Sequence, residues 1–399
     1  MKTLSLRKRL LECCTVASCI LLLLPFATRK TAATSFITLI WMISDESADP
    51  FYRFIRDGKA GYIDSDGKVI IEPRFEVHGN SGGAFYDGLL DTNDGFVDRT
   101  GEVVLKPQFY RTWSFSEGLA AALREEGDKW GYIDHSGKFV IGPRFESFPN
   151  GYVSPFSEGL ALIEVLGKYG YIDHSGRFVI PPRFLYGRNF RDGMACVMVD
   201  NPYPYAEAKF CPDFRSLFAV IQGTSPECKF TFINQSGSVI SSDRYDYAKD
   251  FSEGFAPVRI AGKWGYIDKK GRIVISPQYD DAMAFSNGVA RVRQGDLYGY
   301  IDISGAFTVP IQFEYAEDFA DGLAVVGAGD WKKGDYYYID KRGQQAIAEK
   351  YGLASTFFRG LAHVRLDSVG KVIGDEVEDK EGTYAYIKTT GERVFTYKP

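Results

Sequence analysis

The sequence predicts an all-β protein built as a tandem repeat array of three-stranded β-meanders. Two observations carry this prediction. The tetrapeptide Gly-Tyr-Ile-Asp, or a close variant of it, recurs nine times along the 399 residues, and a glycine follows each copy at a fixed distance. The composition agrees, because 30 Phe, 25 Tyr and 42 Gly are typical of many short strands joined by tight turns.

The repeated tetrapeptide marks units of about 34 residues. Its Tyr and Ile favour a strand, and the Asp at its end favours a turn, because a carboxylate accepts hydrogen bonds from the backbone N–H groups just after it. The glycine three residues later can adopt the positive φ that such a turn needs. The nine copies are Gly61–Asp64, Gly95–Asp98, Gly131–Asp134, Gly170–Asp173, Thr231–Asn234, Gly265–Asp268, Gly299–Asp302, Tyr337–Asp340 and Ala385–Lys388.

Each unit contains the pattern of two further strands. In the third unit, the apolar triplet Phe139–Ile141 predicts a strand, which Pro143 is expected to end because proline cannot donate to a β-ladder. The aromatic residue Phe145 lies eight residues after the turn glycine, as in seven other units, and is expected in the core. A Phe-x-x-Gly segment, as at Phe156–Gly159, then starts a strand that leads into the next tetrapeptide.

A single unit of this kind is too small to bury its own apolar residues, so neighbouring units are expected to stack. We expect the stack to be an open, curved or twisted solenoid. A closed β-propeller is the alternative. It ranks second because nine units would make a large ring, and three strands per unit are one fewer than a blade usually has.

Two motifs together resemble the WG-repeat family. These are Lys-Trp-Gly-Tyr-Ile-Asp at Lys263–Asp268, which recurs at Lys129–Asp134, and Phe-Ser-Glu-Gly at Phe251–Gly254. The resemblance covers nearly the whole chain after residue 50, although Tyr169 and Tyr298 replace the tryptophan in two units. It implies an all-β repeat fold, a largely bacterial family and a role as an interaction module, with no catalytic residue in the motif.

The first 50 residues differ from the repeat array at 51–399. Residues 1–30 are expected to be an export signal or membrane anchor, because basic residues from Lys2 to Arg9 precede an apolar run at Cys13–Ala27. This run is shorter than the about 20 residues of a membrane span. Residues 31–50 are a linker with a second apolar patch. We therefore expect an extracytoplasmic protein, secreted or anchored through this segment.

The charge balance argues against a nucleic-acid partner. The formal net charge is −5, and the leader holds six of the 47 basic residues but one of the 52 acidic ones, so the repeat array is more acidic still. Nucleic-acid binding draws its affinity from Lys and Arg that neutralise phosphates. Contact with a membrane is expected only through the N-terminal segment. With four His in the chain, the sequence indicates no metal site and no cofactor.

Two insertions, at about 200–229 and 367–381, interrupt the array, and such loops often carry binding. The first holds the candidate binding residues Tyr203, Tyr205, Phe210 and Phe214. These aromatic side chains either form the main contact surface or fold back onto the degenerate fifth unit. Cys211 and Cys228 are predicted to form a disulfide that leaves Cys196 free, although Cys196 could pair with either.

A polar residue precedes the core aromatic in every unit that has one. These residues are Arg74, Gln108, Arg144, Arg183, Arg244, Gln278, Gln312 and Lys350. If the units stack with little rotation, the eight side chains form a polar ladder along one face. The ladder is either a solvent-facing row or a surface that faces an anion or a glycan.

The function that these patterns favour is an exported, non-enzymatic scaffold that binds a protein or a cell-envelope polymer. A glycosidase-like enzyme is an alternative, but it needs one unrepeated pair of carboxylates about 5–10 Å apart, and nothing in the sequence singles out such a pair. A purely structural spacer is the other alternative. The sequence indicates no catalytic residue.

Overall fold

The computed structural model describes residues 50–76, 83–146, 153–200, 229–327, 335–367, 372–373, 376–377 and 382–399. All regular secondary structure in these ranges is strand. The same ranges contain no apolar helix of membrane-spanning length. The leader and both predicted insertions fall largely or wholly outside them.

Nine antiparallel sheets of three or four strands follow one another in the described chain, and we call them blades 1 to 9. Blade 1 comprises β1 (Tyr52–Arg56), β2 (Lys59–Ile63) and β3 (Val69–Glu76), and blade 2 comprises β4 (Leu90–Thr92), β5 (Gly95–Val97) and β6 (Val103–Leu105). Blade 3 comprises β7 (Arg111–Thr112), β8 (Ala120–Leu123), β9 (Trp130–Ile133) and β10 (Phe139–Phe145). Blade 4 comprises β11 (Ala161–Val165), β12 (Lys168–Ile172) and β13 (Phe178–Phe184), and blade 5 comprises β14 (Tyr186–Gly187), β15 (Met194–Asp200) and β16 (Lys229–Asn234).

The remaining blades continue the series. Blade 6 comprises β17 (Tyr247–Ala248), β18 (Phe255–Ile260), β19 (Lys263–Asp268) and β20 (Ile273–Tyr279), and blade 7 comprises β21 (Asp281–Ala282), β22 (Val289–Gln294), β23 (Leu297–Asp302) and β24 (Phe307–Phe313). Blade 8 comprises β25 (Tyr315–Ala316), β26 (Ala324–Gly327) and β27 (Tyr337–Ile339). Blade 9 comprises β28 (Leu353–Ala354), β29 (Leu361–Arg365), β32 (Tyr384–Lys388) and β33 (Arg393–Tyr397), and a separate hairpin joins β30 (Val372–Ile373) to β31 (Glu376–Val377).

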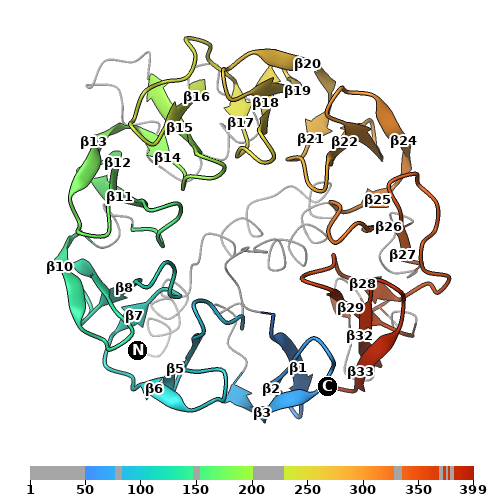
Figure 1. Ribbon diagram of the computed structural model, residues 1–399, viewed down its shortest axis with the longest axis horizontal. Coiled ribbons are helices and arrows are strands. Elements are labelled where there is room, and N and C mark those ends of the chain that lie inside the picture. Colours follow the sequence, from blue (N-terminus) through green and yellow to red (C-terminus); the bar gives the residue numbers. More distant parts are fainter. Residues whose placement is uncertain are drawn as a thin grey trace, which may run out of the picture.

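Within each blade the strands pair in chain order, and the last long strand lies at the outer rim (Figure 1). The predicted meander is therefore confirmed. A short strand of two residues, such as β17, was not predicted and adds a fourth strand at the inner edge of several blades. The expected strand end at proline is wrong, because β10 runs through Pro143 to Phe145 with a register shift. Proline is tolerated there because the outer strand has a free edge.

The paired Tyr and Ile of each tetrapeptide are both buried because each blade packs between two others. In blade 3, Tyr132 and Ile133 have no exposed surface. Tyr132 belongs to the apolar cluster shared with blade 4, whereas Ile133 belongs to the cluster shared with blade 2. Successive side chains of a strand point to opposite faces of the sheet, so one tetrapeptide fills two interfaces.

In blades 3, 4, 6, 7 and 8 the repeated tyrosine also forms a hydrogen bond to the next blade. Its hydroxyl donates to a backbone carbonyl near the inner strand of the following blade, at 2.6–2.7 Å. The pairs are Tyr132 with Ser154, Tyr171 with Arg188, Tyr266 with Met283, Tyr300 with Glu317 and Tyr338 with Ser355. Burial raises the pKa of Tyr300 well above its usual value, so the hydroxyl keeps its proton.

The same bond joins the last blade to the first. The Tyr386 hydroxyl of blade 9 donates to the Arg53 carbonyl of blade 1, and the Tyr52 hydroxyl donates back to the Arg359 carbonyl at 2.8 Å. Phe54 and Tyr397 pack in an apolar cluster that both blades share. The expected open solenoid is thus corrected: these contacts close the repeat array into a ring, the β-propeller alternative (Figure 1).

The aspartate that ends each tetrapeptide holds a turn, as predicted. Asp134 Oδ1 accepts hydrogen bonds from the backbone N–H groups of Ser136 (2.9 Å) and Lys138 (3.1 Å). The Ser136 hydroxyl, assisted by these N–H groups, holds the pKa of Asp134 below its usual value. Asn234 makes the corresponding backbone bonds in blade 5, so an amide oxygen can also hold this turn.

These turns predict a loss of stability in acid. Asp98, Asp134, Asp173 and Asp302 all have lowered pKa values in the fold, chiefly because a Thr or Ser hydroxyl donates to each. A group whose folded pKa is lowered stabilises the fold above its unfolded pKa of about 4, and this contribution is lost as the pH falls through the folded pKa. Replacing the four with Asn should therefore reduce the fall in Tm between about pH 5 and pH 2. Thermal unfolding followed by circular dichroism measures this, and an unchanged pH dependence in the variant would contradict it.

Candidate functional site

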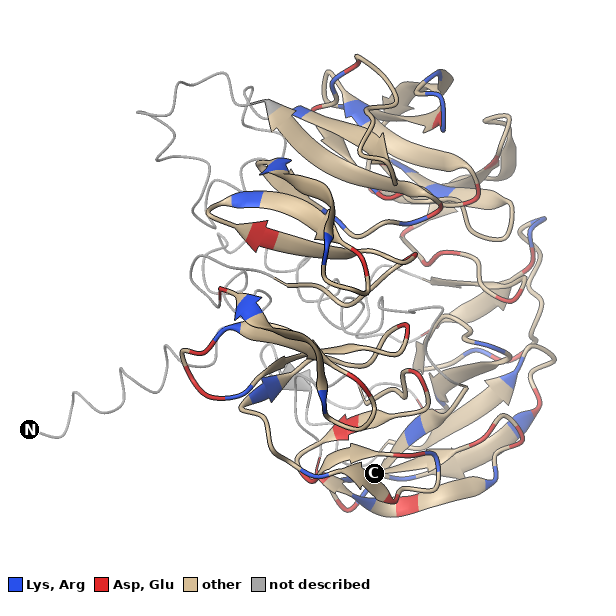
Figure 2. Ribbon diagram, turned by 60° about the vertical axis from the view of Figure 1, so that its left-hand side comes forward, with Lys and Arg blue, Asp and Glu red and all other residues tan. Residues whose placement is uncertain are grey.

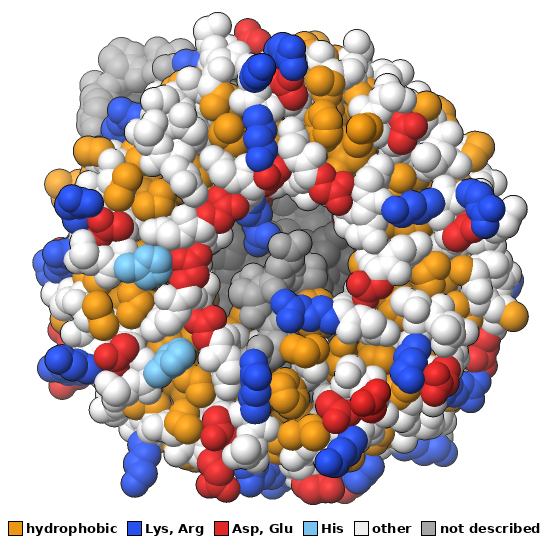
Figure 3. Space-filling model, in the orientation of Figure 1, with side chains coloured by type: hydrophobic (Ala, Val, Ile, Leu, Met, Phe, Trp, Pro, Cys, Tyr) orange, Lys and Arg blue, Asp and Glu red, His pale blue; other side chains and the backbone are white. Residues whose placement is uncertain are grey.

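A ring of turns surrounds the central opening and links the blades on one face. In seven of the eight Phe-x-x-Gly turns, the residue before the glycine is Asp, Glu or Asn, has a φ of 50–57° and reaches toward the next blade. Its side chain accepts a hydrogen bond from the glycine N–H of that blade, and the pairs are Asp87–Gly118, Glu117–Gly159, Glu158–Gly193, Asp192–Gly254, Glu253–Gly288, Asn287–Gly322 and Asp321–Gly360. Figure 3 shows acidic side chains gathered around the opening. We call these seven residues the turn ring.

The turn ring is occupied by contacts within the protein. Beyond its bond to glycine, Asp192 forms an ion pair with Lys269, and Glu117 lies 3.2 Å from the His174 ring. Ser252 and Ser286 donate their hydroxyls to the carbonyls of Phe285 and Phe319 in the next blade, which reinforces the same junctions. Within the residues that the structure describes, no group of three His, Cys, Asp or Glu side chains could hold a metal ion.

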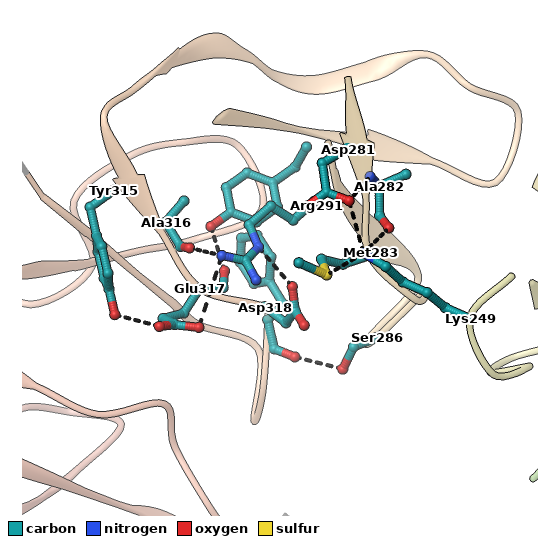
Figure 4. A network of polar contacts seen from close by, with 12 residues as sticks. Lys249, Asp281, Ala282, Met283, Ser286, Arg291, Tyr315, Ala316, Glu317 and Asp318 are labelled. Atoms are coloured by element: carbon teal, nitrogen blue, oxygen red, sulfur yellow. Dashed lines mark hydrogen bonds and ion pairs between the residues drawn. The ribbon is translucent and has the colours of Figure 1, made fainter. Parts of the chain in front are cut away.

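Partly buried ion pairs link blades 5 to 8 near their inner strands, and Figure 4 shows those of Lys249 and Arg291. In each pair a cation of one blade meets a carboxylate of the next: Arg188 with Asp250 at 3.3 Å, Lys249 with Asp281 at 2.8 Å and Arg291 with Asp318 at 2.9 Å. Lys249 also lies over the Trp264 ring, 4.7 Å from its centroid. The tryptophan of the repeat signature therefore packs against a charge that bridges two blades.

Arg291 is the most completely enclosed of these cations, with 7% of its side chain exposed. It donates to the Ala316 carbonyl and lies 3.9 Å from Glu317. Burial opposes its charge, but Asp318 and Glu317 outweigh that effect and raise the pKa of Arg291. The guanidinium is thus charged and matched by two carboxylates of the next blade.

We expect Arg291→Met to lower the free energy of unfolding by about 3 kcal/mol, because it leaves buried Glu317 without its cation. Arg272→Met is the matched control, since Arg272 pairs with Asp268 but is 70% exposed, and its loss should be below about 1 kcal/mol. Urea unfolding of both variants measures the difference. Equal losses would show that the buried charges do not hold blades 7 and 8 together.

The eight predicted ladder residues belong to blades 1 to 8, in or after the last strand of each, and these strands form the outer rim of the ring. Arg74, Arg144 and Arg183 have a role that the sequence did not indicate. Each guanidinium lies about 5 Å over the ring of the following phenylalanine and donates to a turn-glycine carbonyl of the next blade. Glycine is favoured at this turn because Gly176 has a φ of 79°, a conformation that other residues rarely adopt.

The other ladder residues differ from this pattern. Gln108 lies against Gly137, and Lys350 lies 5.5 Å over the Tyr337 ring. Gln278 and Gln312 are exposed. Arg244 instead turns to carbonyls of its own segment, such as that of Ser242 at 2.9 Å. The ladder is therefore partly a set of contacts between blades, and its members do not share one environment.

Two ladder residues meet in a groove of about 530 Å³ at the junction of blades 4 and 5. The lining residues are Arg183, Phe184, Val199, Ser236, Gly237, Ser238, Val239 and Arg244. The groove forms where the outer edge of blade 5 is irregular. After β16, two isolated bridges in the described chain, Ile233–Val239 and Phe230–Tyr245, replace the outer strand that most blades have, and blade 8 has the same arrangement.

An exposed aromatic pair lies on blade 3. Tyr110 is 54% exposed and Trp113 is 43% exposed, and they flank the short strand β7. Trp113 stacks on the buried Trp130 of the repeat signature, with ring centroids 6.3 Å apart. The sequence analysis missed this pair. A comparison of the repeats could have found it. Asp280 and Met283 hold the corresponding positions in blade 7, so aromatic residues at these two positions of blade 3 depart from the repeat.

The predicted binding loop and disulfide lie outside the described residues. This applies to Tyr203, Tyr205, Phe210 and Phe214 and to Cys211 and Cys228, so those predictions stay predictions. Cys196 is described, and it is a free, buried thiol in β15. Burial raises the pKa of Cys196 to about 12, which keeps the thiol protonated.

Comparisons with solved structures support the ring fold. A structure titled as the eukaryotic initiation factor aligns with a TM-score of 0.57 at 9% identity, over 88% of this chain and 96% of that chain. The computationally designed Ika8 protein aligns with a TM-score of 0.39 at 11% identity, over 71% and 85% of the two chains. Streptogramin B lyase gives 0.30 at 14% identity, over 71% and 92%. At 9% identity, the likeness to the first structure concerns the fold alone. The alignments to the other two structures, with TM-scores of 0.39 and 0.30, give no support for a shared fold.

Comparison of the sequence with families gives a specific result. No curated protein matches the chain. The family described as WG containing repeat matches residues 61–89, 95–126, 130–169, 169–203, 230–264, 264–298 and 298–330, which together are more than half of the sequence. The matched segments fall on blades 1 to 8, in register with the repeated tetrapeptide. The chain therefore belongs to the WG containing repeat family.

Proposed function

We infer that this protein is a non-enzymatic binding scaffold, and that the exposed pair Tyr110 and Trp113 on blade 3 forms its main described contact surface. Exposed aromatic side chains are the residue type that most often anchors interfaces. Here both rings are well exposed in a fold whose repeated aromatic residues are buried. This pair is the observation that carries the proposal.

The stacking of Trp113 supports a binding role for a second reason. Its ring packs against Trp130, which is 6% exposed and fixed in the core. A side chain that is already held in place loses little conformational entropy when it contacts a partner. The repeated polar residues are less available, because the turn ring and the interblade tyrosines already bond to neighbouring blades.

The partner is a protein or a polymer of the cell envelope, and the protein acts outside the cytoplasm. The support for this location is the basic and apolar pattern of residues 1–30. Aromatic faces pack on apolar protein side chains and on the C–H faces of sugars alike, so the patch suits both partner classes. An enzymatic role is disfavoured because the turn ring, the most obvious set of acidic side chains, accepts bonds from backbone N–H groups.

A photo-cross-linking amino acid at Tyr110 of the full-length chain tests this proposal in the source cells. We expect a saturable covalent adduct with one partner. The same group at Phe307 is the control, because Phe307 is 48% exposed on the outer strand β24. Adding Trp113→Ala to the Tyr110 probe should weaken capture by about tenfold or more, as for loss of an interface anchor.

Three outcomes would contradict the proposal. One is an equal adduct pattern from the Tyr110 and Phe307 probes, which would indicate random contact. Another is full capture in the presence of Trp113→Ala. The third is no saturable adduct from Tyr110 at all, which would favour a structural spacer.

A further inference from the structure

The groove between blades 4 and 5 differs from the other blade junctions in its charge. At the junctions made by Arg74 and Arg144, one guanidinium reaches the turn glycine of the next blade. At the junction of blades 4 and 5, Arg183 makes the same contact with Gly237 at 2.6 Å, and Arg244 lines the same groove from the other side. The lining contains no acidic residue, although the chain as a whole has a formal net charge of −5.

The arrangement of donors suits an acceptor ligand. One N–H of Arg183 is used in the bond to Gly237, and a guanidinium has five. Ser236 and Ser238 lie beside it on the turn that Asn234 holds, but the Ser236 hydroxyl already donates to Asn234 Oδ1 at 2.7 Å and bonds to the Ser238 hydroxyl at 3.0 Å, so the two guanidinium groups are the main donors. The positive charges of Arg183 and Arg244 thus face one hollow.

The apolar side of the groove limits the kind of ligand. Phe184, Val199 and Val239 contribute to the lining, and Val239 is 42% exposed. A volume of about 530 Å³ lies in the range of small-molecule sites, which combine apolar walls with a few placed polar groups. A bare ion would fill little of it.

We propose that this groove is a binding site for an anionic organic ligand, whose carboxylate or phosphate group lies between Arg183 and Arg244. The charge-assisted bonds from guanidinium groups to such oxygens are stronger than neutral hydrogen bonds. The body of the ligand packs on Val199 and Val239. This site is independent of the aromatic pair on blade 3 and does not rest on the function proposed above.

Calorimetric titration of the full-length chain with three probes tests the site. Glucose 6-phosphate represents the phosphate source, glucuronate represents the carboxylate source, and glucose is the neutral control. We expect one or both anions to bind with a stoichiometry of one, and glucose not to bind. The anion that binds more tightly identifies the source of the acidic group.

Matched variants locate the binding. Arg244→Gln should weaken it by about tenfold or more, as for removal of a hydrogen bond to a charged group. Arg144→Gln removes the equivalent ladder residue at the junction of blades 3 and 4 and should leave it unchanged. Val239→Glu, at an exposed position, should abolish binding by placing a carboxylate in the groove.

The proposal is overturned by any of four results. Neither anion binds, glucose binds as well as the anions, Arg244→Gln and Val239→Glu bind as tightly as the natural chain, or Arg144→Gln weakens binding as much as Arg244→Gln. The last result would assign binding to the general charge of the rim. Unchanged thermal unfolding of Val239→Glu confirms that its effect is local.

Discussion

The hydrogen bond that the repeated tyrosine donates to a backbone carbonyl of the next blade, at six of the nine junctions, is the interaction on which the ring depends. It is made by Tyr132, Tyr171, Tyr266, Tyr300 and Tyr338 within the series and by Tyr386 across the closing junction. An unmade hydrogen bond at a buried group is costly, so each bond fixes the position of the next blade. Phe96 and Phe232 replace the tyrosine in blades 2 and 5, where the ring packs edge-on against Phe115 and Phe251.

Closure leaves few of the repeated residues for recognition. The tyrosines, the turn ring and three of the ladder arginines each bond to the neighbouring blade. Charges of both signs are interspersed over the ring (Figure 2), and several of them pair across junctions. Binding specificity therefore depends on positions where the residue of one blade differs from the corresponding residues of the other blades. Trp113 and Arg244 are such positions: Trp113 stacks on the repeated Trp130, and Arg244 donates to carbonyls of its own segment.

Much of the fold could be predicted because each strand and turn is determined by residues that lie close together in the sequence. The turn at Asp134 and the burial of Tyr132 follow from residue types within one unit. Closure could not be predicted, because the rotation between neighbours arises from the shapes of two packed faces, such as the Tyr52 and Tyr386 pair. The polar ladder was predicted from the spacing of its residues in the sequence. Spacing does not show that Arg183 reaches Gly237 across the junction between two blades. The exposure of Tyr110 could not be predicted, because residue type alone does not distinguish it from the many aromatic residues that are buried.

Pairwise distances between spin labels test closure most directly. Lys68, Lys138, Arg177 and Glu392 are exposed and hold the same turn position in blades 1, 3, 4 and 9. In the ring, the distance between labels at Lys68 and Glu392 should equal that between the neighbours Lys138 and Arg177, and it should be shorter than that between Lys68 and Arg177. If the Lys68–Glu392 distance is instead the longest of the three, the array is open and the closing contacts of Tyr52 and Tyr386 do not form.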